Sequence, residues 1–165
     1  MRRYDAAMRI DLIERELVHS IVERELVHSI VTAFHSVYNY YDFGLAESLY
    51  CGALEYELRD RGHSVAREVA VDVEYKGRHV GWQRIDLIVD GKVVVEVKAS
   101  EALPKYAKRQ LLSYLRVTTC QVGLVLHFGP RPKFYRLADL RPKRAVRERR
   151  STGPRKATET SEGTE

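Results

Sequence analysis

The sequence predicts an α/β domain in which helices flank a central mixed sheet. Three observations support this prediction. Residues 65–75 alternate apolar and polar side chains, and so do the two halves of the segment 84–98 on either side of Asp90-Gly91, which is typical of strands. Helix-like periodicity precedes and follows that segment. Residues 121–128 then form a nearly continuous apolar run, as expected for a strand buried on both faces. The expected order is helix, three strands, helix, strand.

The first helix, expected over residues 6–40, contains the nonapeptide ERELVHSIV twice, at 14–22 and 23–31. Nine residues turn a helix by about 900°, half a turn beyond two full turns, so the copies face opposite sides. The second copy aligns with Phe34, Val37 and Tyr38. The first copy points away, and its stripe is either a self-association surface or a frayed end with exposed aliphatics: Leu17, Val18, Ile21, Val22. We therefore expect residues 1–24 to be a helical extension ahead of a domain spanning 25–140.

A second helix is expected over residues 45–61, because an apolar stripe ends at Gly62, a natural helix stop. Glu47 falls in its first turn, where the helix dipole favours a carboxylate. Tyr50 lies one turn later and is expected to pack or hydrogen-bond nearby.

Residues 65–75 predict a strand, Lys76-Gly77 a turn, and residues 78–82 a short return strand that leads into a hairpin over 84–100. In the hairpin, a three-residue loop with Gly91 in a left-handed conformation pairs Val89 with Val93 and sets Asp86 opposite Glu96. A two-residue loop would mix polar and apolar residues on each face. The chosen register leaves one apolar face: Ile85, Leu87, Val89, Val93, Val95, Val97.

That register has a chemical consequence for Asp86, Glu96 and Lys98, which share the other face. Like charges opposite each other destabilise a strand pair by about 0.2–1 kcal/mol. A cation between the carboxylates removes this cost, and either Lys98 or a divalent metal such as Mg²⁺ would serve. The plainer alternative is a solvated polar face with an incidental Glu–Lys pair.

The C-terminal third begins with a helix expected over residues 105–117, behind Pro104, on which Gln110 and Tyr114 lie one turn apart on one face. Residues 133–137 are expected to add an edge strand. Residues 141–156 hold eight basic residues and one acidic residue, whereas residues 157–165 hold three acidic residues. We expect 141–165 to be disordered, either as a solvated end or as a phosphate-binding arm.

Composition favours a cytoplasmic protein. No apolar run approaches the roughly 20 residues of a membrane span, and the N-terminus lacks the apolar region of a secretory signal. Cys51 and Cys120 have no metal-ligand spacing and are expected to be reduced thiols in or near the core. His19 and His28 belong to the repeat and lie on opposite helix faces, so they cannot share a metal ion. The other four histidines are scattered and are expected to be ordinary surface or core residues.

Three motifs carry a family resemblance. Asp86, followed by Glu96-Val97-Lys98 on a hairpin, resembles the core motif of the PD-(D/E)XK nuclease superfamily. Gly44, Glu47 and Tyr50 reproduce the signature of the GxxExxY proteins, a bacterial group placed in that superfamily. The segment 110–114 resembles the QxxxY helix of RecB-type nucleases, and the match runs from about residue 25 to 137. Ile85 stands where the superfamily usually has proline.

The resemblance implies a restriction-endonuclease-like αβββαβ core and Mg²⁺- or Mn²⁺-dependent hydrolysis of nucleic acid, with DNA the expected partner. It assigns Asp86 and Glu96 as metal ligands, with the Val97 carbonyl as a further ligand. It places Glu47 on the metal through water or on a second ion. Lys98 would orient the attacking water or stabilise charge on the phosphorane. Gln110 and Tyr114 would pack beside Lys98 and contact the phosphate backbone. The alternative is a catalytically silent module with this fold, binding nucleic acid or a protein partner.

Overall fold

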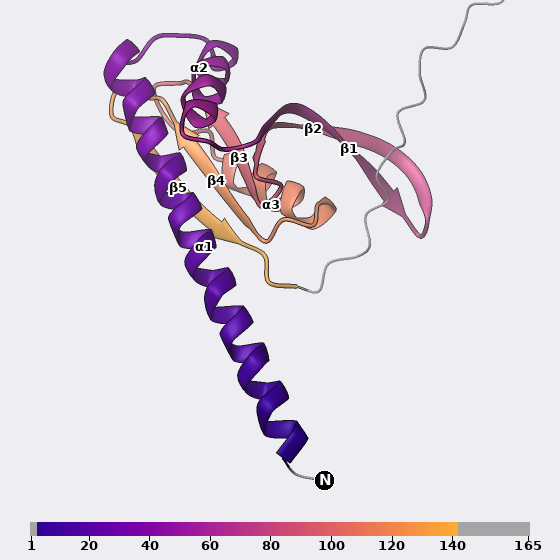
Figure 1. Ribbon diagram of the computed structural model, residues 1–165. Coiled ribbons are helices and arrows are strands. Elements are labelled where there is room, and N and C mark those ends of the chain that lie inside the picture. Colours follow the sequence, from indigo (N-terminus) through magenta and orange to yellow (C-terminus); the bar gives the residue numbers. More distant parts are fainter. Residues whose placement is uncertain (1–2, 142–165) are drawn as a thin grey trace, which may run out of the picture.

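The structure is a computed structural model that describes residues 3–141, with side chains from residue 20 onward (Figure 1). It contains the predicted order of helix, three strands, helix and strand. One helix precedes this core and one edge strand follows it. The elements are α1 (Arg3–Tyr41), α2 (Glu47–Asp60), β1 (Val65–Tyr75), β2 (Arg78–Val89), β3 (Val93–Lys98), α3 (Ala107–Val117), β4 (Val122–His127) and β5 (Lys133–Ala138).

The sheet has five strands in the order β1-β2-β3-β4-β5. β3 and β4 are parallel, and every other neighbouring pair is antiparallel, which confirms the mixed sheet. Parallel strands need a crossover connection, and α3 supplies it between β3 and β4. The edge strand expected near residues 133–137 is β5, paired with β4.

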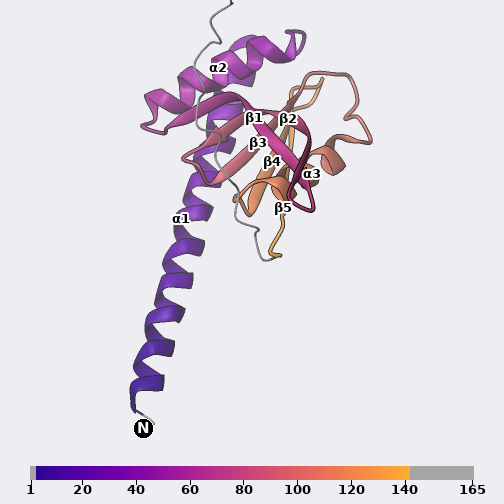
Figure 2. The same ribbon diagram turned by 90° about the vertical axis from the view of Figure 1, so that its right-hand side faces the viewer.

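The helices cover the two faces of the sheet separately (Figure 2). α1 and α2 pack on one face around a core that includes Phe34, Leu54 and Leu124. α3 packs on the other face through Leu111 and Leu115. As a result, every residue of β3 and of β4 is buried. This was predicted for β4. In β3 the polar residues Glu96 and Lys98 are buried as well, which excludes the solvated-face alternative.

The two nonapeptide copies differ in burial as predicted. Leu26 and Ile30 of the second copy are buried in the core with Phe34. Ile21 and Val22 of the first copy are 52% and 38% exposed. The other apolar residues of the first copy, Leu17 and Val18, lie outside the described side chains, so the association surface stays a prediction. The N-terminal half of α1 extends beyond the sheet in both views (Figures 1 and 2).

The hairpin register is confirmed. Val89 pairs with Val93 and Leu87 with Val95, and Gly91 at the turn has φ 65°. Two details differ from the prediction. β2 is one continuous strand from Arg78 to Val89, so no separate return strand exists there. Ile85 packs in the α3-side core instead of with the other five residues of the predicted apolar face. The backbone of the neighbouring strand β1 is irregular close to Ile85, because Glu68 has a φ of 53°.

A hydrogen-bonded chain of Ser29, His63 and Asp90 holds α1, the α2–β1 loop and the β2–β3 turn together. Ser29 Oγ lies 2.7 Å from His63 Nε2, and His63 Nδ1 lies 2.8 Å from Asp90 Oδ2. Partial burial raises the pKa of Asp90, but the bonds from His63 and Ser64 outweigh it, so this pKa is lowered. His63 is therefore a structural residue, which agrees with the expectation of an ordinary histidine.

The remaining expectations concern the cysteines, the membrane and the tail. Cys51 and Cys120 are buried, reduced thiols, as predicted. Burial raises the pKa of the Cys51 thiol to about 12. Within the described part of the chain, no helix has the length and apolarity to cross a membrane. The predicted basic arm falls almost entirely on residues 142–165, outside the described residues.

Candidate active site

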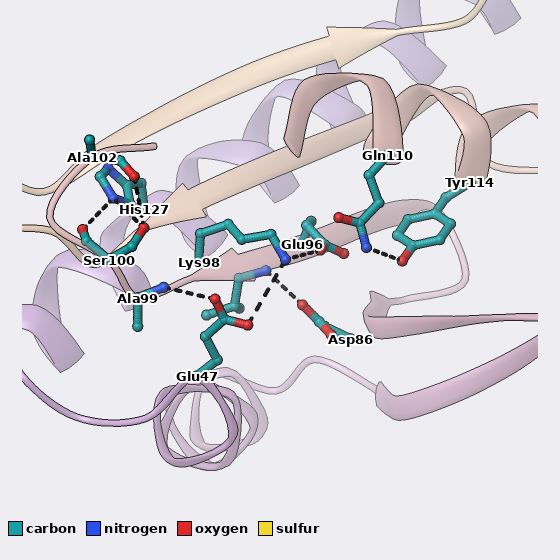
Figure 3. A network of polar contacts seen from close by, with 11 residues as sticks. Glu47, Asp86, Glu96, Lys98, Ala99, Ser100, Ala102, Gln110, Tyr114 and His127 are labelled. Carbon is teal, nitrogen blue, oxygen red and sulfur yellow. Dashed lines mark hydrogen bonds and ion pairs between the residues drawn. The ribbon is translucent and has the colours of Figure 1, made fainter. Parts of the chain in front are cut away.

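Four charged side chains converge where β2 and β3 separate (Figure 3). Glu96 and Lys98 come from β3, Asp86 from β2 and Glu47 from the first turn of α2. The backbone ladder between β2 and β3 ends at the Leu87–Val95 pair. Beyond it the Asp86 side chain continues the connection, because Asp86 Oδ2 accepts a 2.8 Å hydrogen bond from the Val97 N–H.

Glu96 and Lys98 form a buried ion pair. Their exposed fractions are 1% and 6%, and Lys98 Nζ lies 2.5 Å from Glu96 Oε1. Lys98 is therefore a cation beside the carboxylates, as the register suggested, and burial excludes the solvated-face alternative for this pair. Glu96 Oε2 is buried with no hydrogen-bond partner among the described residues. A buried carboxylate oxygen without a partner is costly and therefore marks a place for a ligand.

Burial shifts the ionisation of these groups. It raises the pKa of Glu96 to about 7, and the nearby Asp86 charge acts in the same direction. It also raises the pKa of Asp86, although the Val97 N–H opposes this. Burial alone would lower the pKa of Lys98, but the bond to Glu96 outweighs it and the pKa is raised. Lys98 is thus held as an ammonium ion at neutral pH.

Glu47 links the start of α2 to the end of β3. Its Oε1 accepts a 3.2 Å hydrogen bond from the Ala99 N–H, and its Oε2 lies 3.9 Å from Lys98 Nζ. The side chain is 46% exposed, so it approaches the pair from the solvent side. The resemblance had assigned Glu47 to this place.

Tyr50 holds the loop that positions Glu47. Its hydroxyl donates to the Asp42 carbonyl at 2.5 Å and accepts from the Leu45 N–H at 3.2 Å. Its ring is fully buried and stacks on Phe128 with a centroid distance of 4.0 Å. Gly44, with φ 133°, allows the turn between these contacts. Tyr50 therefore packs and hydrogen-bonds nearby, as predicted.

Gln110 and Tyr114 lie on the α3 face turned toward this site (Figure 3). Gln110 Nε2 donates to the Tyr114 hydroxyl at 2.6 Å. Burial raises the pKa of Tyr114, and the charge of Glu96 contributes to the shift. Gln110 Oε1 is buried without a partner among the described residues. The pair thus borders the Glu96–Lys98 site, and its predicted contact with a phosphate backbone stays a prediction.

The donor set fits a small hard cation. Mg²⁺ is usually held by one or two carboxylates together with water and substrate oxygens. Asp86 and Glu96 supply two carboxylates, and the buried Glu96 Oε2 lacks another partner among the described residues. Three or more His, Cys, Asp or Glu side chains arranged to enclose an ion do not occur in the described part of the chain. The fit therefore rests on two carboxylates, with Glu47 as an outer group.

Two neighbours of Lys98 were not predicted from the sequence. His127 pairs with Lys98 in the parallel β3–β4 ladder and is almost completely buried. The Tyr106 ring centroid lies 5.9 Å from Lys98 Nζ, within range of a cation–π contact. No sequence motif marks His127 or Tyr106. The β3–β4 pairing places His127 beside Lys98, and the path of the chain after β3 places Tyr106 there.

Comparison with known proteins supports the motif assignment. A family model described as PD-(D/E)XK nuclease superfamily matches residues 24–137. Among solved structures, the chain is similar to the crystal structure of a protein named SSO0001, with a TM-score of 0.44 and 21% identity. That alignment covers 55% of this chain and 48% of the other, so the chain spans about half the length of that protein. No curated protein matches the sequence.

Proposed function

Because the chain belongs to the PD-(D/E)XK nuclease superfamily, we propose that it is a metal-dependent nuclease that hydrolyses phosphodiester bonds of nucleic acid, with DNA the expected substrate. The observation that supports this most directly is the buried Glu96–Lys98 pair, to which Asp86 and Glu47 converge. The cost of removing two charges from water can exceed the attraction between them, and groups with strongly perturbed pKa values cluster at functional sites. The motif Gly44–Glu47–Tyr50 supports the further proposal that the chain is one of the GxxExxY proteins within this superfamily.

Asp86 and Glu96 would hold Mg²⁺ or Mn²⁺, with the Val97 carbonyl as a further ligand and Glu47 acting through water or on a second ion. When bound, the ion polarises the scissile phosphate and lowers the pKa of a bound water. The two reduced cysteines suit the reducing conditions of the cytoplasm, where we propose that the protein acts.

Lys98 would act on the phosphate itself. Its ammonium group is held by Glu96 and stays protonated because its pKa is raised. A fixed positive charge at this point orients the attacking water or stabilises the charge that develops on the phosphorane. Gln110 and Tyr114 are hydrogen-bonded to each other beside Lys98, and they would contact the phosphate backbone.

Cleavage assays on single- and double-stranded DNA and RNA, with Mg²⁺ and with Mn²⁺, test the proposal. We expect Asp86→Ala, Glu96→Ala and Lys98→Ala each to lower cleavage about a hundredfold or more while the protein stays folded. Lys92→Ala, which removes an exposed cation from the β2–β3 turn, is the matched control and should cleave normally. Undiminished cleavage by both Asp86→Ala and Lys98→Ala would remove this site from the mechanism.

The second candidate is a nuclease-fold module that binds nucleic acid or a protein without cutting. One observation favours it: the ammonium group of Lys98 already neutralises the carboxylate of Glu96. Calorimetric titration with Mg²⁺ and Mn²⁺ separates the two candidates. Binding that is lost in Glu96→Ala supports the nuclease, whereas no divalent binding by the wild type supports the module.

A further inference from the structure

A pocket of about 310 Å³ opens beside the Lys98 site. One wall is the loop that follows β3, at residues 101–103, and the opposite wall is the β4–β5 loop at Pro130 and Arg131. His127, Lys133 and Tyr135 line it from the strands. Because His127 is the ladder partner of Lys98, the pocket begins one strand away from the site, about 4.8 Å across the sheet.

The pocket is positively charged. Arg131 and Lys133 are exposed cations on its lining, against the single acid Glu101. Among the described residues, no acidic side chain forms an ion pair with either cation. Lys108 adds a third cation at the edge, with its Nζ 3.8 Å from the centroid of the Tyr135 ring. Unpaired cations around a concave polar surface attract anions.

Hydrogen bonds hold the β4–β5 wall in place. The Tyr38 hydroxyl, from α1, lies 3.0 Å from the Gly129 carbonyl and 3.2 Å from the Pro130 carbonyl. At Gly129 a Cβ atom would lie 2.6 Å from His127 Cε1, so only glycine allows the loop to pass this close. Arg131 is therefore presented from an anchored loop.

The opposite wall is also anchored (Figure 3). His127 Nε2 donates to the Ser100 carbonyl at 2.7 Å, and the Ser100 hydroxyl donates to the Ala102 carbonyl at 2.9 Å. These bonds leave His127 Nδ1 buried and without a partner among the described residues. Both walls are thus formed before any ligand arrives, which reduces the entropy lost on binding.

We propose that this pocket binds a phosphate group of the nucleic-acid backbone that neighbours the scissile phosphate. The inference rests on the proposed function, because the adjacent Lys98 site sets the position of the scissile group. Arginine is suited to this role, since its planar fork binds phosphate through two parallel hydrogen bonds, and Lys133 adds a point charge. The pocket thereby fixes the register of the substrate strand on the enzyme.

The test measures oligonucleotide binding in EDTA, so that it does not depend on metal or cleavage. We expect the double variant Arg131→Ala/Lys133→Ala to bind at least about tenfold more weakly than the wild type. Its slope of log affinity against log salt should be flatter by about 0.7–0.9 for each phosphate that the variant no longer neutralises. The control Lys92→Ala/Arg116→Ala removes two exposed cations at the opposite end of β3 and should bind within about twofold of the wild type. Equal weakening in both double variants would overturn the proposal.

A scan with neutral methylphosphonates locates the phosphate. Substitution at one or two adjacent positions should weaken binding by the wild type but not by Arg131→Ala/Lys133→Ala, which is the signature of a coupled pair. A uniform pattern in both proteins would overturn the proposal. A second experiment measures the binding of inorganic phosphate to the wild type at constant ionic strength. Binding of inorganic phosphate by the wild type without any coupled backbone position would assign the pocket to free phosphate and overturn its assignment to nucleic acid.

The outcomes separate this inference from the proposed function. If the wild type binds nucleic acid through the pocket but cleaves no substrate, the phosphate-binding proposal stands and the nuclease proposal fails. If cleavage depends on Lys98 but Arg131→Ala/Lys133→Ala binds as tightly as the wild type, the nuclease proposal stands and the phosphate-binding proposal fails. Both double variants change exposed side chains only, and thermal unfolding checks that every variant is folded.

Discussion

At the scale of single residues, Glu96 is held in an unusual state. One of its oxygens is bound to Lys98, and the other is buried without a partner among the described residues. Nearby Asp86 adds negative charge, which opposes ionisation of Glu96. A proton or a metal ion stabilises a carboxylate in this position, and the folded protein is less stable when the carboxylate has neither.

The pH dependence of stability reports this state. The native pKa of Glu96 is about 7, against an ordinary value of 4.5, so the folded protein binds this proton more tightly than the unfolded chain. The resulting stabilisation is complete below about pH 4.5 and is lost as pH rises through about 7. In EDTA, we expect the unfolding free energy of the wild type to fall by up to about 3 kcal/mol more than that of Glu96→Gln between pH 4.5 and 8. Urea unfolding at several pH values measures it.

The control for this experiment is Glu74→Gln, which changes an exposed glutamate on β1. Its pH curve should run parallel to that of the wild type. Parallel curves for wild type and Glu96→Gln would contradict a raised pKa at Glu96.

Tyr50 connects a buried ring to the placement of Glu47. Tyr50→Phe keeps the ring on Phe128 but leaves the Leu45 N–H and the Asp42 carbonyl without their partner. We expect the unfolding free energy to fall by about 1–3 kcal/mol and cleavage to fall with it, because the loop before Glu47 loosens. Tyr56→Phe, an exposed tyrosine on the same helix, should change neither quantity. If Tyr50→Phe is destabilised but cleaves at the normal rate, the loop that Tyr50 holds does not control the position of Glu47.

At the scale of secondary-structure elements, the distance between α3 and β4 decides where Gln110 and Tyr114 lie. α3 approaches the sheet closely at Gly123 of β4, where an added Cβ would lie 2.6 Å from Leu111 Cδ1. Leu111 is fully buried, so it has little room to move away. The helix can pack at this distance only because the strand has no side chain there.

Gly123→Ala tests that packing. We expect it to destabilise the protein by about 1–3 kcal/mol, because the methyl group overpacks the α3 interface. Gly52→Ala, inside α2, adds the same methyl group 3.2 Å from the flexible end of Arg67. It should be neutral or stabilising by up to about 1 kcal/mol, since alanine favours a helix. Denaturant unfolding measures both, and equal effects would show that Leu111 yields to the added group.

At the scale of the whole molecule, the predicted basic arm can be tested by truncation. Arg141 forms an ion pair with the buried Asp139, with 2.7 Å between Nε and Oδ1, so the cut belongs after Arg141. Truncation there removes seven cations of the segment 142–156. If about four of them contact phosphates, the slope of log affinity against log salt should flatten by about 3–4.

Cleavage at saturating substrate should change little in the truncated protein, because Asp86, Glu96 and Lys98 lie in the described fold. Equal salt slopes for the full chain and the truncated chain would show that the arm does not touch nucleic acid.

Local pattern in the sequence was sufficient for the elements and for the hairpin. Side-chain alternation and Asp90-Gly91 specify the Val89–Val93 register, since a slip by one residue would move every side chain to the other face. The stop at Gly62 is local as well: Gly62 has φ 87°, and the His63 N–H bonds the Leu58 carbonyl. The motif residues Glu47, Asp86, Glu96 and Lys98 could be named in advance because their spacing matches a known family.

Only the tertiary structure decided the environment of those residues. The burial of Glu96 and Lys98 depends on α3 crossing over β3, and the Asp86–Val97 bond depends on where the β2–β3 ladder ends. The place of His127 beside Lys98 follows from a parallel pairing between segments about 30 residues apart. The same holds for the pocket at Arg131 and Lys133, which is built from two loops and two strands. Alternation along a strand fixes which side chains share a face, but burial and pKa depend on what packs against that face, and that is set by contacts distant in sequence.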